Sequence, residues 1–202
     1  MRSRVLVFSF NLILLFQLAS SYAQNNYDKF FVDKTMRIDF FHTGTKGSQV
    51  ISLDKIYEEP AVMPQNKKMW AGNKVNLLDI LNLGKYQVKV FDEATKQIIF
   101  SKGFSSVFGE WETTDEAGQG MYRTFHETVL FPFPKEKILL TISARDKENN
   151  FQDIFSTDID PNSRFVNREW HCPSYKVQTL LTSGYPHNKV DLVFLGDGYT
   201  KS

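Results

Sequence analysis

The sequence has 202 residues, with 24 basic and 23 acidic side chains and a formal net charge of +1. Such a balance gives no electrostatic reason to expect a nucleic acid or an anionic membrane as a partner. Hydrophobic residues make up 42% of the chain, which is enough for the core of one domain, and the single cysteine, Cys172, excludes an internal disulfide.

The first residues have the pattern of a signal peptide. Arg2 and Arg4 precede an apolar run over residues 5–18, and the small residues Ser21 and Ala23 occupy the two positions that a signal peptidase requires. A membrane anchor is the alternative, but a spanning helix needs about 20 largely apolar residues, and this run is shorter and contains Asn and Gln. We therefore expect cleavage near Ala23, export to the periplasm or the exterior, and no membrane association afterwards.

Apolar and polar residues alternate along much of the mature chain. Over Thr35–Phe41, for example, Met36, Ile38 and Phe40 fall on one face. Because successive side chains of a strand point to opposite faces, the alternation indicates half-buried strands. The same pattern occurs in Ser48–Ile56, Lys85–Phe91, Gln97–Phe100, Arg123–Phe131, Ile138–Arg145 and Phe151–Thr157. Six or seven strands joined by polar turns predict an all-β fold, an antiparallel β-sandwich that is immunoglobulin-like in general architecture and spans residues 24–163.

The segments between these strands are less regular. Asn76–Leu83 fits either a short helix with Asn76 as its N-cap or an irregular crossover, and the sequence does not decide between them. Glu59–Gly72 and Gly109–Gly120 are rich in Pro, Asn, Gly and charged residues and are predicted to be long loops.

The chain changes character after the predicted sandwich. Residues 164–189 show little periodicity and are predicted to form a connector. Val190–Leu195 is a mostly apolar run followed directly by Gly-Asp-Gly-Tyr, a pattern typical of a parallel strand that enters an α/β domain. We therefore expect residues 190–202 to be the truncated start of a second domain.

No motif for catalysis is assigned in this chain. A catalytic zinc site usually takes three protein ligands, commonly from a His-Glu-x-x-His motif, and the sequence has none. His126 and Glu127 fall on a predicted strand, where neighbouring side chains point to opposite faces. Structural or solvent-facing roles are therefore expected for the four histidines, His42, His126, His171 and His187.

Two further sets of residues have a functional and a structural interpretation. Asp158 with Asp160, and Asp115 with Glu116, could offer oxygen ligands to calcium, but they lack EF-hand spacing and are expected to be solvated turn residues. Trp70, Trp111, Tyr122 and Trp170 could line a carbohydrate-binding face, whereas core or loop-anchoring roles are commoner for such residues. No catalytic, cofactor-binding or metal-ligating residue is predicted.

Seven segments, which together cover residues 34–200, carry a resemblance to a known family. They are Met36–His42 (MRIDFFH), Trp70–Asp79, Leu81–Tyr86 (LNLGKY), Phe104–Glu112 (FSSVFGEWE), Thr124–Pro134 (TFHETVLFPFP), Ile142–Ile159 and Val190–Thr200 (VDLVFLGDGYT). Taken in this order, they resemble the N-terminal domain of the IgA peptidase family of secreted bacterial zinc metallopeptidases, in the form found in Bacteroidetes.

The resemblance implies a non-catalytic accessory domain whose peptidase partner domain is absent from this sequence. Zinc, its His-Glu-x-x-His ligands and the glutamate base are expected only in that missing domain, so the chain by itself is predicted to be inactive and to hold no cofactor. The accessory domain would dock the catalytic domain or position a protein substrate. The alternative is a stand-alone exported binding module for a glycan or a host protein, which would use aromatic residues around Trp70 and Trp111.

Overall fold

The computed structural model describes residues 26–59, 69–169, 179–181, 184–189 and 192. The predicted signal peptide, Trp170, His171, Cys172 and nearly all of the predicted second-domain start lie outside the described residues. In the part that is described, no helix is both long enough and apolar enough to cross a membrane.

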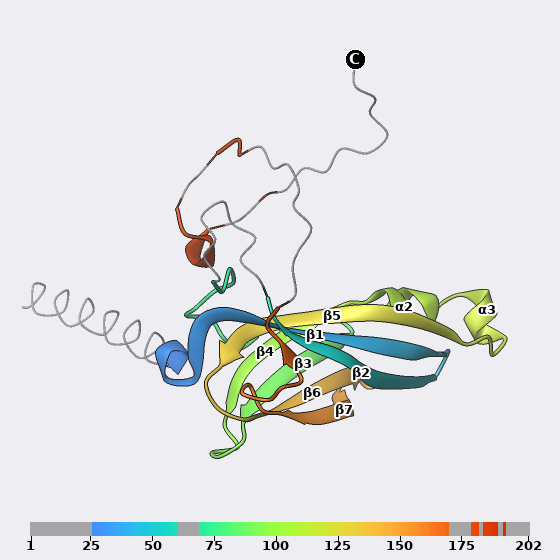
Figure 1. Ribbon diagram of the computed structural model, residues 1–202. Helices are drawn as coiled ribbons and strands as arrows, with labels where there is room; N and C mark the ends of the chain where they lie inside the picture. The colour runs from blue at the N-terminus through green and yellow to red at the C-terminus, as the bar shows by residue number, and fades with distance from the viewer. Residues whose placement is uncertain (1–25, 60–68, 170–178, 182–183, 190–191, 193–202) are drawn as a thin grey trace, which may run out of the picture.

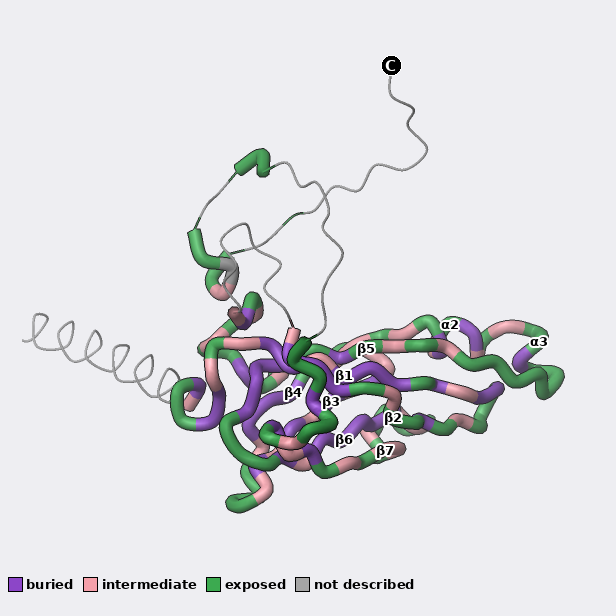
Figure 2. The backbone as a smooth tube through the Cα atoms, viewed as in Figure 1, coloured by how far each residue is buried: buried purple, intermediate pink, exposed green. Residues whose placement is uncertain are grey.

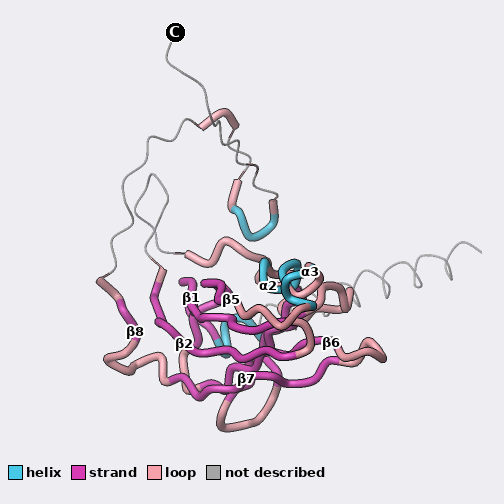
Figure 3. Tube along the Cα trace, turned by 90° about the vertical axis from the view of Figure 1, so that its right-hand side faces the viewer, coloured by secondary structure: helices cyan, strands magenta, loops and turns pink. Residues whose placement is uncertain are grey.

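Two four-stranded sheets pack face to face and form a β-sandwich, as the sequence predicts (Figures 1 and 3). Sheet A has the strand order β5-β1-β2-β8, and sheet B has the order β4-β3-β6-β7. Neighbouring strands are antiparallel except β2 and β8, which are parallel. The strands are β1 (Phe31–Thr45), β2 (Ser48–Glu58), β3 (Tyr86–Asp92), β4 (Ile98–Phe104), β5 (Arg123–Pro134), β6 (Ile138–Arg145), β7 (Phe151–Ile159) and β8 (Val166–Asn167).

The alternation seen in the sequence places every second side chain of a strand in the core between the two sheets. Buried positions line the facing sides of the two sheets, whereas exposed positions lie on their outer sides and in the turns (Figure 2). Large side chains dominate this core, including Phe40, Phe131 and Leu140. Burial of such side chains contributes about 1.5–3 kcal/mol each, which accounts for a stable sandwich without disulfides.

One predicted loop is wrong in part, because Gly109–Gly120 overlaps two short helices. They are α2 (Val107–Trp111) and α3 (Asp115–Gly118). Each begins at a hydroxyl cap: the Ser106 side chain accepts from the Gly109 N–H, and the Thr114 side chain accepts from the Ala117 N–H. Helices of five and four residues are too short to produce a visible periodicity, so the glycines and charges dominated the sequence pattern. A 3-10 turn, η1, covers Pro186–Asn188.

These two helices cover an overhang of sheet A. β1 has 15 residues and β5 has 12, whereas β3 and β4 have seven each. The longer strands therefore extend beyond sheet B, and α2 and α3 lie at that end of the sandwich (Figure 1). The Trp111 indole N–H donates to the carbonyl of Gly44 at 3.3 Å, and the Thr45 hydroxyl donates to the carbonyl of Ala117 at 2.6 Å. The helices thus bury an inner sheet face that sheet B does not reach.

A buried histidine joins this cap to the sheet. His42 Nδ1 lies 3.1 Å from Glu127 Oε2, and its Nε2 lies 2.9 Å from Gln49 Oε1. The imidazole stacks on the Phe108 ring with centroids 3.9 Å apart and 20° between the planes, and it meets Tyr86 edge-on. The other Glu127 oxygen accepts from the Phe108 N–H at 3.1 Å. Sheet A and α2 are therefore linked by one buried polar cluster.

This cluster predicts a pH dependence of stability. Burial by itself raises the pKa of Glu127, but hydrogen bonds from His42, from the Phe108 backbone and from Ser106 outweigh it and hold the pKa below its ordinary value. At acidic pH the unfolded chain then binds more protons than the folded chain. The contribution of Glu127 to the free energy of unfolding is therefore complete above about pH 4.5, the ordinary pKa, and is lost as the pH falls through the lower pKa of the folded state. We expect the urea midpoint of Glu127→Gln to fall less on acidification than that of the wild type; equal falls would contradict this role.

Candidate functional site: an aliphatic docking surface

Five large aliphatic side chains stand exposed on one segment between β2 and β3. Ile80 is 89% exposed and Leu81 is 71% exposed. Contiguous exposed apolar patches on a folded domain commonly mark interaction sites, whereas single exposed residues do not. We call this set the aliphatic ridge; it consists of Val75, Leu78, Ile80, Leu81 and Leu83.

The ridge segment is an irregular crossover, which settles the alternative that the sequence leaves open. Residues 76–83 contain no helix. Asn73, rather than Asn76, starts the local turn: its side-chain oxygen accepts from the N–H groups of Val75 and Asn76, each at 2.7 Å. This bonding closes a turn at residues 73–76 instead of capping a longer helix.

Hydrogen bonds tie the segment to the edge of β4. The Leu77 carbonyl accepts from the Ser101 N–H at 2.9 Å, and the Ser101 hydroxyl accepts from the Asp79 N–H at 2.9 Å. The two carboxylate oxygens of Asp79 accept from the N–H groups of Leu81 and Gly103 at 2.9 and 3.0 Å. Leu77 is buried in the main core. The polar groups and one leucine are therefore used for attachment, and the ridge side chains are left facing outward.

Two glycines permit this close attachment. A Cβ at Gly103 would clash with the carbonyl oxygen of Leu83. Gly84 has a φ of +86°, which glycine adopts without strain, and a Cβ there would lie 2.6 Å from the Phe104 carbonyl oxygen. The backbone of the ridge thus lies directly against β4.

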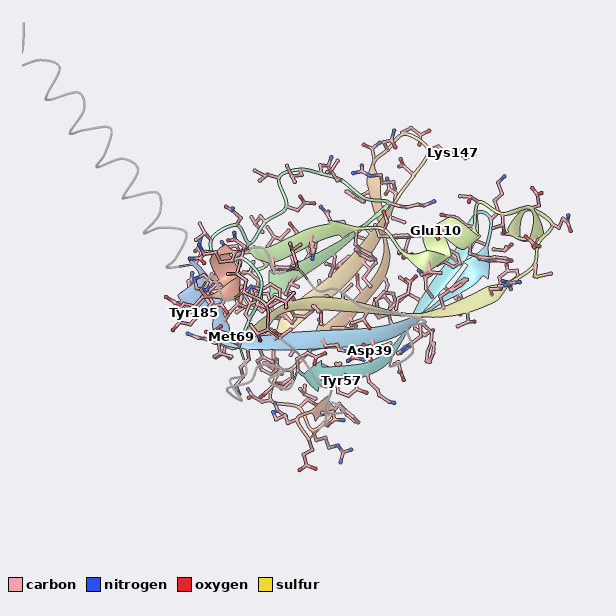
Figure 4. The ribbon with its side chains drawn as sticks, turned by 90° about the horizontal axis from the view of Figure 1, so that it is seen from above. Asp39, Tyr57, Met69, Glu110, Lys147 and Tyr185 are labelled. Atoms are coloured by element: carbon pink, nitrogen blue, oxygen red, sulfur yellow. The ribbon has the colours of Figure 1, made fainter. Side chains whose placement is uncertain are left out.

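Arg145 holds the far end of the ridge. Its guanidinium donates to the carbonyls of Asn82 at 2.6 Å, Gly84 at 2.7 Å and Asn149 at 2.7 Å. The guanidinium also lies over the Phe151 ring, 4.1 Å from its centroid. One side chain of β6 therefore joins the ridge to the β6–β7 turn, whose Lys147 projects at the tip of the molecule (Figure 4). The hydrogen bonds of Arg145 therefore hold the ridge backbone in one conformation.

A second polar network lies on the outer side of sheet A, where the chain leaves the sandwich. Arg37 pairs with Asp39 at 2.7 Å and with Glu59 at 3.1 Å, and Asp39 and Tyr57 lie on the side of sheet A away from sheet B (Figure 4). Arg168, directly after β8, lies 3.8 Å from the buried Glu58. Its guanidinium also donates to the carbonyl of Val166 at 3.2 Å. These contacts fix the start of the predicted connector.

The described histidines are separated from one another. His42 is buried in the cap, whereas His126 lies on the opposite face of sheet A, 3.1 Å from Asp54 Oδ2. Glu127 points inward to His42, so His126 and Glu127 do lie on opposite faces, as their strand position predicts. His187 lies in η1. Among the described residues, no group of three or more His, Cys, Asp or Glu side chains could hold a metal ion.

The predicted carboxylate pairs have local roles in the structure. Asp115 and Glu116 lie in the first turn of α3, where negative charge stabilises a helix N-terminus. Asp160 accepts from the Asn162 N–H in the turn after β7.

The core and loop-anchoring roles expected for tryptophans are confirmed for Trp70 and Trp111, and the alternative of an aromatic binding face around these two residues is excluded. Both rings are buried, and both indole N–H groups are used inside the fold, by the carbonyls of Asn73 and Gly44. These two tryptophans anchor loops to the sheets, so neither can offer a ring face to a sugar. Tyr122 is exposed, and Trp170 lies outside the described residues.

The described residues thus form a β-sandwich domain with an exposed aliphatic ridge at one edge. The family model described as the peptidase M64 N-terminus matches residues 26–156, which include β1 to β6 and most of β7. The chain therefore belongs to this family, the N-terminal domain of IgA peptidase-family proteins, as the resemblance indicates. A comparison with curated proteins found no match.

Proposed function

We propose that this chain is a non-catalytic accessory domain of a secreted zinc metallopeptidase of the IgA peptidase family and that it docks the catalytic domain through the aliphatic ridge. The observation that carries the proposal is the ridge itself, because its five exposed aliphatic side chains stand on a backbone fixed by Asp79, Ser101 and Arg145. The family membership supplies the occupant, since the matched domain is the N-terminal part of a peptidase.

Docking through such a surface would be driven by burial of apolar area. Each exposed aliphatic side chain that becomes fully buried contributes about 1.5–3 kcal/mol, and little of this is lost to ordering because the segment is already fixed. In this proposal the zinc, its ligands and the peptide-bond chemistry belong to the catalytic domain. The N-terminal signal peptide exports the whole protein.

The test measures binding between the full chain and a separately produced peptidase domain of the family. We expect micromolar or tighter binding by calorimetry, and we expect Ile80→Asp to weaken it at least about tenfold, because a carboxylate would have to be desolvated at the interface. Val50→Asp is the matched control, since Val50 is an exposed aliphatic residue on β2 of sheet A, whereas the ridge is attached to β4 of sheet B. In the same samples, the chain alone should not hydrolyse casein, with or without zinc.

Absence of binding would overturn the docking role. Equal weakening by Ile80→Asp and Val50→Asp would show that binding occurs without the ridge. Chelator-sensitive hydrolysis of casein by the chain alone would overturn the non-catalytic role.

A further inference from the structure

A strip of aromatic and hydroxyl side chains lies on the outer face of sheet A, over its overhang. Its members are Phe41 and Thr43 on β1, Thr124 and His126 on β5, and Tyr122 just before β5. Side chains alternate faces along a strand, so Phe41 and Thr43 point away from the inner face that carries His42. We call this set the outer strip; it lies on a different part of the molecule from the aliphatic ridge.

One end of the strip is an aromatic pair. The Phe41 side chain is 40% exposed, and its ring lies 5.1 Å from the His126 ring, with the planes tilted by 45°. His126 Nε2 lies 3.1 Å from Asp54 Oδ2. The imidazole is thereby held beside the phenyl ring, and the pair forms a fixed, partly exposed ring surface on the outer face of sheet A.

The other end carries a second ring, with hydroxyls between the two ends. Tyr122 is 60% exposed, and its hydroxyl donates to the Ser48 hydroxyl at 3.2 Å. The Thr43 and Thr124 hydroxyls lie 2.9 Å apart on adjacent strands, between the two aromatic ends. His126 is four positions after Tyr122 in the sequence, which is about 13 Å along an extended chain. A ligand that touches both ends is therefore an oligomer rather than a single small ring.

The chemistry of the strip selects the class of ligand. Exposed ring faces favour apolar, flat C–H surfaces, and threonine and serine hydroxyls both donate and accept hydrogen bonds. Sugar chains present both of these features in alternation. The Asp54 carboxylate lies beside the strip, 3.1 Å from His126 Nε2, so an uncharged ligand is complementary and an acidic one would meet this carboxylate. We propose that the outer strip binds a neutral glycan chain.

The test titrates the full chain with defined oligosaccharides. The neutral probes are cellohexaose, laminarihexaose, mannohexaose and N-acetylchitohexaose, and hexagalacturonate is the acidic comparison. We expect at least one neutral probe to bind, and Phe41→Ala and Tyr122→Ala each to weaken it about tenfold, in line with the loss of one aromatic contact. Leu130→Ala is the matched control, because Leu130 is exposed on β5, opposite Arg37 and outside the strip.

Thermal unfolding of each variant identifies any loss of fold. If Phe41→Ala does not fold, Tyr122→Ala alone tests the proposal. Tyr122 precedes β5 and belongs to no strand, so its substitution is expected to leave the fold unchanged. Binding of no neutral probe, binding of hexagalacturonate alone, or unchanged binding by both alanine variants would overturn the proposal. Ile80→Asp should leave glycan binding unchanged. The docking role of the ridge and the glycan-binding role of the strip can therefore be disproved independently of each other.

Discussion

His42→Ala is expected to lower the free energy of unfolding by about 3–5 kcal/mol. The substitution removes the ring that Glu127 and Gln49 contact at 3.1 and 2.9 Å, and it leaves the Glu127 carboxylate buried with one partner fewer. It also leaves a space beneath the Phe108 ring, which now lies 3.9 Å from the imidazole. Both effects fall on the contact between sheet A and α2. Urea unfolding of the full chain measures the change.

His126→Ala is the matched control for this prediction. His126 lies on the same sheet and also faces a carboxylate, that of Asp54 at 3.1 Å, but its side chain is 46% exposed. Exposed pairs contribute about 0–1 kcal/mol. Equal losses in the two variants would show that the buried polar cluster adds nothing beyond an ordinary surface pair.

Trp70→Ala is expected to lower the free energy of unfolding by about 3–5 kcal/mol, as is usual for a buried tryptophan. The Trp70 ring meets Phe100 edge-on, with centroids 6.0 Å apart. Its indole N–H donates to the carbonyl of Asn73 at 3.1 Å, so the side chain fastens the segment that leads to the ridge. Urea unfolding gives the loss, and hydrogen exchange of the Ser101 and Gly103 amides reports on loosening of the ridge.

Tyr122→Ala is the control for Trp70→Ala, because it removes an exposed aromatic side chain instead of a buried one. Tyr122 lies on the surface, so its substitution should change stability by less than about 1 kcal/mol while it weakens glycan binding. Trp70→Ala should lower the stability but leave glycan binding unchanged, when binding is measured at temperatures where this variant remains folded. A stability loss below about 1 kcal/mol for Trp70→Ala would contradict its place in the core.

The sandwich could be predicted because its strands alternate clearly. Segments such as Arg123–Phe131 and Ile138–Arg145 show the period of two that a sheet with one buried face requires. The short helices were missed because their stability comes from tertiary contacts, such as Phe108 on His42, rather than from a repeated pattern.

The candidate site could be predicted only in part. The leucine-rich run at residues 77–83 is visible in the sequence, but its exposure depends on where Asp79 and Arg145 attach the backbone, and Arg145 is 62 residues beyond Leu83. The sequence likewise does not show which of its aromatic residues are buried. Nothing local distinguishes Trp111, which is covered by the sheet and by Arg123, from Tyr122, which is exposed. Long-range packing decides both cases.

The parallel strand β8 has a mechanical consequence. It pairs with β2 only at Ile56 and Tyr57, and the residue that follows its last pair, Arg168, approaches the Glu58 carboxylate. Tension transmitted through the connector would therefore load this short pairing before it reached β1 or β5. Detachment of β8 would lengthen the connector and would withdraw Val166 from the main core, whereas the ridge and the outer strip contain no residue of β8.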